Sequence, residues 1–151
     1  MRRMVAVFLG LLAATITAFA RQDAAADDGK TIQGTWKVVS CEHGGKKLPD
    51  DKVKDAVLIF ADGIFTFKEG GKTITVGNYR LDPEAKPGVL DIVATEGPAK
   101  GQSQHGIYEL KGDDLKLCQS FGVDRRPAEF KSVNVADEGN PRMLWIPRRV
   151  K

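Results

Sequence analysis

The sequence has few of the residues that build metal and nucleophile sites, with two cysteines and two histidines among 151 residues. His43 and His105 lack a second histidine or cysteine at zinc-ligand spacing, and Cys41 with His43 supplies two ligands where a structural site takes four. No serine lies in a Gly-x-Ser-x-Gly motif, and no glycine-rich loop joins a strand to a helix. The sequence therefore predicts surface histidines, no metal, no nucleotide cofactor and no catalytic constellation, and it favours a protein that is not an enzyme.

Carboxylates are plentiful, but they fall in predicted turns, where such side chains bond to nearby backbone amides. These positions are Asp50, Asp51, Asp62, Asp82, Asp113 and Asp114. Two carboxylates brought together by the fold would support a glycosidase-like reaction. A hydrolase therefore remains as the least favoured alternative.

A strong charge of either sign is also missing. The formal net charge is +3, and removing Arg2 and Arg3 with the first twenty residues leaves +1. Nucleic acid is not a predicted partner, because phosphate binding needs a concentrated cationic face. A short basic cluster near the end of the chain is interpreted as a solvated strand end. It comprises Arg142, Arg148, Arg149 and Lys151.

The first twenty residues have the three parts of an export signal. A cationic start precedes the apolar run from Val5 to Ala20, and small residues at Ala18 and Ala20 predict cleavage after Ala20. The run has sixteen residues, whereas a membrane-spanning helix needs roughly 20. The sequence thus predicts a signal peptide at 1–20, no permanent membrane anchor, and a mature protein that is periplasmic or secreted.

The mature chain is predicted to have a linker and one domain. Residues 21–30 carry no large apolar side chain, so burial cannot offset the entropy of ordering them, and we interpret them as a flexible linker. Residues 31–151 are of a size for one domain with its own core.

From Thr31 onward, short apolar runs alternate with turn residues, which is typical of an all-β meander. The clearest pair is Val57–Phe60 and Ile64–Phe67, separated by Asp62-Gly63, a strong hairpin signal. A weaker strand is expected at Phe130–Val135 and a helical turn at Pro49–Lys54. About eight strands without a covering helix favour a small antiparallel up-and-down β-barrel, because closure removes exposed edges. A two-sheet β-sandwich is the alternative.

Strand alternation predicts which side chains face the barrel interior. They are Trp36, Val38, Phe65, Phe67, Tyr79, Leu90, Ile92, Tyr108, Leu115 and Leu117. Small barrels either fill with side chains or hold one small ligand, so these residues are the candidate site for a small apolar or amphipathic ligand. The alternative is a cell-envelope protein-protein interaction or inhibitor module that uses the loops at Asp82–Gly88 and Thr95–Ser103.

Two segments share the pattern Gly-x-Tyr-x-Leu, one beginning at Gly77 and the other at Gly106. We interpret the glycines as positions where a strand bends sharply while tyrosine and leucine pack. The alternative is that the hydroxyl groups of Tyr79 and Tyr108 line a cavity.

Cys41 and Cys118 would meet an oxidising compartment after export, where distant thiols commonly pair. Alternation places Cys41 opposite Trp36 and Cys118 opposite Leu117 on their strands, so both are expected to point away from the core. A disulfide then requires the strands to bring the two Cα atoms within about 7 Å. The pairing stays open at this stage.

A set of motifs covers nearly all of residues 31–149. They are Gly34-Thr35-Trp36, Gly44 to Lys46 with Leu48-Pro49, Tyr79 to Pro83, Thr95 to Pro98 and Gly106 to Cys118. In combination they resemble a small exported domain of planctomycete bacteria that has no established activity. The resemblance supports the architecture and implies no biochemical role.

Gly34-x-Trp36 also resembles the first-strand signature of lipocalins, in which the tryptophan closes one barrel end and an arginine from the last strand lies across it. The resemblance implies that Gly34 and Trp36 are structural. It also implies a cation over the indole, with Arg148 as the first candidate and Arg149 as the second. The lipocalin Thr-Asp-Tyr triplet is missing from this chain, which counts against lipocalin-type ligand carriage.

Overall fold

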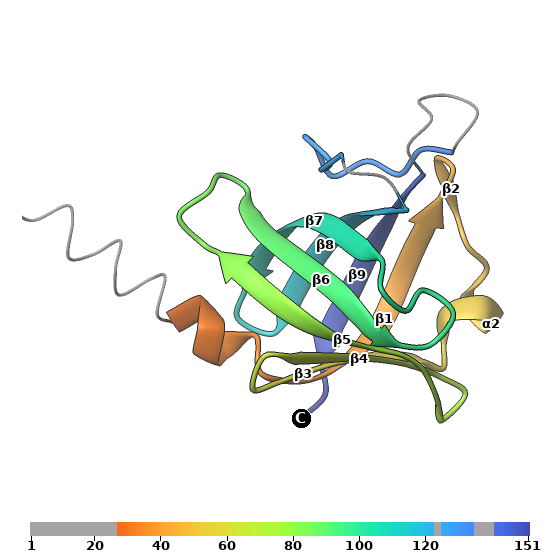
Figure 1. The fold of residues 1–151 in the computed structure, drawn as a ribbon. Coiled ribbons are helices and arrows are strands. Elements are labelled where there is room, and N and C mark those ends of the chain that lie inside the picture. The colour runs from red at the N-terminus through yellow and green to blue at the C-terminus, as the bar shows by residue number, and fades with distance from the viewer. Residues whose placement is uncertain (1–26, 123–124, 135–140) are drawn as a thin grey trace, which may run out of the picture.

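The computed structural model describes residues 27–122, 125–134 and 141–151. The predicted signal peptide and residues 21–26 of the predicted linker lie outside these ranges. Residues 27–31 are helical, so regular structure is present on the N-terminal side of the expected boundary at Thr31 (Figure 1). No helix within the described ranges is long and apolar enough to span a membrane.

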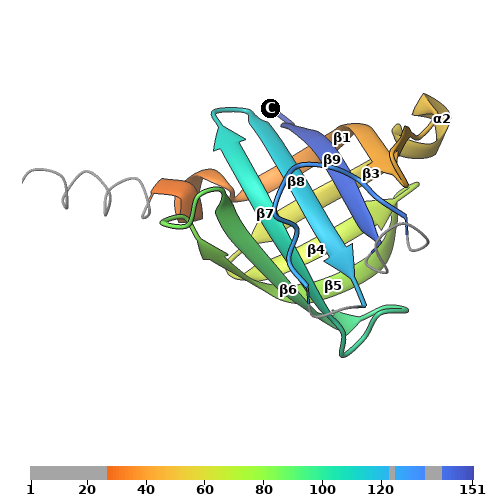
Figure 2. The ribbon, with the colours of Figure 1, turned by 90° about the horizontal axis from the view of Figure 1, so that it is seen from above.

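The domain is a closed antiparallel barrel of eight strands with one short additional strand. The strands are β1 (Gly34–His43), β2 (Lys46–Lys47), β3 (Ala56–Ala61), β4 (Ile64–Glu69), β5 (Lys72–Asp82), β6 (Gly88–Glu96), β7 (Ser103–Lys111), β8 (Asp114–Phe121) and β9 (Arg142–Arg149). Apart from β2, each strand pairs with its neighbour in sequence, and β9 returns to pair with β1 (Figure 2). This closure confirms the predicted barrel and excludes the sandwich.

Local sequence explains the turns. Asp62 and Gly63 have φ values of +49° and +81°, as a two-residue hairpin turn requires, and they join β3 to β4 at the pair Ala61 and Ile64. The expected helical turn is also present as α2 (Asp50–Val53), which begins directly after Pro49. The strand expected at Phe130–Val135 is wrong for its described part, since Val133 makes one isolated bridge, to Arg142.

The interior follows the predicted alternation. Eight of the ten predicted inward residues are buried in the main core, and Phe67 and Tyr79 pack against it partly buried. The core extends to Ile32 and Phe60, whose side chains are fully buried. Alternation therefore identified the inner face correctly at the ten predicted positions.

A β-bulge in β1 changes the orientation of Cys41. The register between β1 and β9 shifts between Val38 and Ser40, opposite Pro147, which has no N–H to donate to the ladder. The extra residue reverses the alternation, so Cys41 joins Trp36 and Val38 in the main core. The expectation that Cys41 points outward is thus wrong.

Cys118 does face outward from the barrel, but it is buried as well. It packs with Ile107 and Leu144 in a second cluster that is covered by Phe130, a member of the outer segment, residues 125–134, which runs over β8 and β9 (Figure 2). Because Cys41 faces the lumen and Cys118 the outside, the barrel wall separates the two thiols. Both cysteines are free.

Candidate functional site

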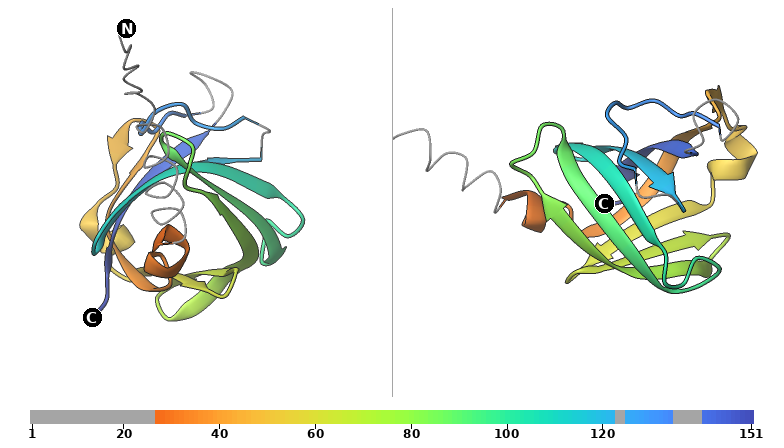
Figure 3. Two further views of the ribbon diagram at one scale, coloured as in Figure 1. Left: turned by 90° about the vertical axis from the view of Figure 1, so that its left-hand side faces the viewer. Right: turned by 45° about the horizontal axis from the view of Figure 1, so that its top comes forward.

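One end of the barrel, the closed end, is covered by the helical residues 27–31 (Figure 3, left). Trp36 is fully buried at this end. The indole Nε1 donates a hydrogen bond of 2.8 Å to the carbonyl of Ile32. The guanidinium of Arg149 lies 4.2 Å from the centre of the Trp36 ring. Gly34, at φ +120°, leaves room for this group, since a Cβ there would lie 3.1 Å from Nη1 of Arg149.

The arginine over Trp36 is therefore Arg149, and the choice of Arg148 as first candidate was wrong. Arg148 points outward, with its side chain 67 % exposed, and pairs with Asp114 at 3.1 Å. Strand pairing explains the difference, because Arg149 is the residue opposite Trp36 across β9 and β1, and paired residues project to the same face.

The two tyrosines of the repeated pattern also belong to the closed end. Tyr79 Oη accepts a hydrogen bond from Gln33 Nε2 at 2.9 Å, and Tyr108 Oη donates one to Asp28 at 2.8 Å. Burial raises the pKa of both phenols, and the bond to Asp28 raises that of Tyr108 further. Their hydroxyl groups thus hold the N-terminal segment in place.

The opposite end, the open end, contains a pocket of about 420 Å³. Its wall comes from the barrel strands, α2 and the loop after β6. The lining residues are Leu48, Lys52, Val53, Ala56, Leu58, Phe65, Phe67, Glu69, Ile74, Thr75, Pro98, Ala99, Gln104, Gln119, Phe121, Met143 and Trp145. Most of these side chains are apolar, so the pocket suits an apolar molecule.

The pocket only partly coincides with the residues proposed from the sequence. Of the ten predicted interior side chains, Phe65 and Phe67 line it, whereas the other eight pack in the core that fills the rest of the barrel. Phe67 meets Trp145 across the lumen with ring centroids 5.7 Å apart. Sequence reasoning missed Trp145, because its list of inward residues ended at Leu117 and assigned none to the last strand.

Two glutamines bring polar groups into this apolar pocket. Gln104 and Gln119 are 7 % and 3 % exposed, and they lie on β7 and β8. Gly106 makes room for Gln119, since a Cβ on Gly106 would lie 3.0 Å from the Gln119 Cγ. Gln119 Nε2 and Trp145 Nε1 are buried and have no hydrogen-bond partner within the described ranges.

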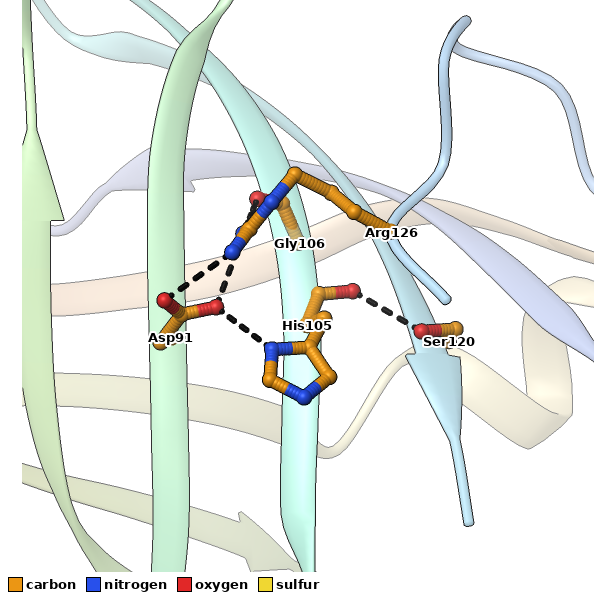
Figure 4. Close-up of polar contacts among 5 residues, drawn as sticks. All are labelled: Asp91, His105, Gly106, Ser120 and Arg126. Atoms are coloured by element: carbon orange, nitrogen blue, oxygen red, sulfur yellow. Dashed lines mark hydrogen bonds and ion pairs between the residues drawn. The ribbon is translucent and has the colours of Figure 1, made fainter. Parts of the chain in front are cut away.

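A second polar cluster lies on the outer face of the barrel, away from the pocket (Figure 4). Arg126 Nη1 and Nη2 lie 2.7 and 3.1 Å from the two carboxylate oxygens of Asp91, and His105 Nδ1 lies 2.9 Å from one of them. Arg126 also donates to the carbonyl of Gly106 at 2.9 Å. Because Arg126 belongs to the outer segment, the cluster fastens that segment to β6 and β7.

The cluster determines the ionisation of Asp91. Burial works against the carboxylate, but the hydrogen bonds and charges of Arg126 and His105 outweigh it and hold the pKa of Asp91 below its usual value. His105 is thus bound in an ion-pair network, with its side chain 22 % exposed, whereas His43 is exposed as expected. Asp91 and His105 lie opposite each other on β6 and β7, which the meander predicts as neighbouring strands. No sequence pattern predicted that Arg126 would lie beside them.

The remaining candidate chemistry gains no support. No group of three or more metal-ligating side chains occurs in the part of the chain that the structure describes. Burial, reinforced by the charge of Glu42, raises the pKa of Cys41 to about 12. Burial also raises the pKa of Cys118, so neither thiol is prepared to act as a nucleophile.

Comparison of the chain with known protein families, with curated proteins and with solved structures gave no significant match.

Proposed function

We propose that this protein binds a small apolar or amphipathic molecule in the open-end pocket. The observation that carries the proposal is a pocket of about 420 Å³ with a mainly apolar lining in an otherwise filled barrel. Sites for small molecules are about 300–1,000 Å³ in volume and have this kind of lining. Export by the predicted signal peptide would place the binding outside the cytoplasm.

The driving force would come from removing apolar surface from water. At ~30 Å³ for each water molecule, the pocket has room for about fourteen. Aromatic walls formed by Phe67, Phe121 and Trp145 offer a ligand large contact areas at low entropic cost. A ligand would enter at the open end, where α2 forms part of the pocket wall.

The interaction module gains less support. Among the described residues, the large apolar side chains that are exposed are Val39, Ile64, Val93 and Val150. Three of them lie on three different strands, β1, β4 and β6, and Val150 follows β9. They therefore do not suggest the contiguous apolar patch that marks a protein interface.

Titration with the neutral fluorophore N-phenyl-1-naphthylamine tests the proposal. Thr75 lines the pocket and is half-buried, so Thr75→Trp is expected to fill the pocket and weaken dye binding at least about tenfold, or about 1.4 kcal/mol. Thr73→Trp is the matched control, because Thr73 lies on the same strand, is exposed and is not part of the lining. Absence of dye binding to the unmodified protein, or equal binding by both variants, would refute the proposal.

A further inference from the structure

Within the described part of the chain, two buried N–H groups in the open-end pocket have no hydrogen-bond partner. Gln119 is 3 % exposed, and neither its Nε2 nor Nε1 of Trp145 has a hydrogen-bond partner among the residues that the structure describes. An unpaired buried donor is unfavourable, and nearly all such groups in folded proteins are paired. Both residues line the pocket, so a bound molecule is in reach of both donors.

The two donors come from adjacent strands. Gln119 pairs with Met143 and Leu117 with Trp145 across β8 and β9, which makes Gln119 and Trp145 diagonal neighbours on the inner face, within reach of long side chains. Trp145 is held by its ring contact with Phe67. Gln119 crosses over Gly106, where a Cβ would intrude. The protein therefore holds the donors in place before a ligand arrives.

Donors of this kind call for an acceptor. Amide and indole nitrogens donate and do not accept, whereas a carbonyl oxygen has two lone pairs and accepts two hydrogen bonds. A hydroxyl group could satisfy the donors too, but it would also need an acceptor for its own proton, whereas a carbonyl group brings no proton to place. The pair of donors thus favours a carbonyl group.

The charges around the pocket exclude a carboxylate as the acceptor. Of the described residues that line it, Lys52 and Glu69 are ionisable, and both are exposed. Arg142 is buried nearby, but it alternates with the inward Met143 and so lies on the outer side of β9, where it bridges to Val133. A carboxylate deep in the pocket would lack a buried cation, and burying it unpaired is costly.

We infer that the open-end pocket selects a neutral, mainly apolar molecule that carries a carbonyl group, received by Gln119 Nε2 and Trp145 Nε1. This inference rests on the proposed function and specifies its ligand. The ligand class comprises ketones, aldehydes, esters and tertiary amides, none of which brings a donor of its own, with an apolar body that fits the pocket.

Displacement of N-phenyl-1-naphthylamine by four ten-carbon probes tests the inference. Decan-2-one is expected to bind about tenfold more tightly than decane, through two added hydrogen bonds, and more tightly than decan-2-ol or decanoate. Gln119→Leu removes a donor at similar volume, and Trp145→Phe removes the other while it keeps an aromatic ring. Each is expected to reduce the preference for decan-2-one over decane. Gln102→Leu is the control and is expected to keep that preference, because Gln102 is exposed and is not part of the lining.

A second measurement needs no ligand. Gln119→Leu removes an unpaired buried donor, so the empty variant is expected to melt at a higher temperature than the unmodified protein, and a lower melting temperature would overturn the inference. Equal displacement by decane and decan-2-one, or tighter binding of the alcohol or the carboxylate, would overturn it while leaving the proposed function intact. If neither the dye nor any probe binds, the proposed function fails and this inference with it.

Discussion

Arg149 is expected to be the most important charged side chain for stability, and its neighbour Arg148 provides a matched control. The guanidinium of Arg149 stacks on Trp36 at 4.2 Å and donates hydrogen bonds to the carbonyls of Gln33, at 2.7 Å, and Thr31. It also pairs with Asp113 at 3.1 Å. All of these contacts are lost in Arg149→Leu, which leaves two carbonyls of the closed end without their donor.

The magnitude follows from the burial of each contact. A largely desolvated cation over an indole contributes about 1–2 kcal/mol, each hydrogen bond from a charged donor about 1.5 kcal/mol or more, and the partly exposed pair with Asp113 under about 1 kcal/mol. Arg149→Leu should therefore lower the free energy of unfolding by about 4 kcal/mol, a large part of the roughly 5–15 kcal/mol of a typical domain. Arg149→Lys keeps the charge but loses the planar fork, so about 2 kcal/mol is expected.

Urea unfolding followed by tryptophan fluorescence measures these differences, since Trp36 is fully buried. Arg148→Leu removes an ion pair whose two side chains are 67 % and 70 % exposed, and such pairs contribute about 0–1 kcal/mol. The reasoning is refuted if the two leucine variants lose similar stability, or if Arg149→Leu costs less than about 1 kcal/mol.

Acid is expected to destabilise the fold through Asp91, because the pKa of this carboxyl is lowered in the folded state. The ionised carboxylate stabilises the fold fully above the unfolded-state pKa of about 3.9, and this stabilisation is lost as the pH falls through the folded-state pKa. Asp91→Asn should flatten the loss of stability below about pH 4, and an unchanged pH profile would count against the ion pair with Arg126. Neither Cys41 nor Cys118 should react with a maleimide in the folded state at pH 8, whereas both should react in urea, and a native disulfide on a non-reducing gel would contradict the burial on opposite sides of the wall. Gly106→Ala should destabilise the domain by about 1–3 kcal/mol, since the added Cβ would lie within 3.0–3.1 Å of two backbone carbonyl oxygens, and an unshifted urea midpoint would show that the strands can part there.

The barrel was predictable because its signals are local. Asp62-Gly63 determines a hairpin through the φ values that its residues accept, and alternation within each strand identifies the core. Alternation also predicts which arginine lies over Trp36. Trp145, Pro147 and Arg149 alternate on one face of β9, and Arg149 lies opposite Trp36.

The errors arose where one strand depends on another. The bulge in β1 lies opposite Pro147, which comes more than a hundred positions later in the chain. The sequence around Cys41 therefore does not indicate that the Cys41 side chain turns to the inner face. Phe130 has an apolar side chain but covers the outside of the barrel without joining the sheet. The pocket lining likewise combines α2, β4 and β9, and sequence reasoning gave no distances between them.

Both ends of the described chain leave the molecule at its closed end. Residues 27–31 pack there through Asp28, and Lys151 pairs with Asp113 in the turn between β7 and β8. A bead, dye or fusion partner attached at Lys151 would therefore stand away from α2 (Figure 1), whose residues line the pocket. A protein immobilised there would present its open end to the surrounding solution, so surface-based screening of compounds needs no redesign of the chain.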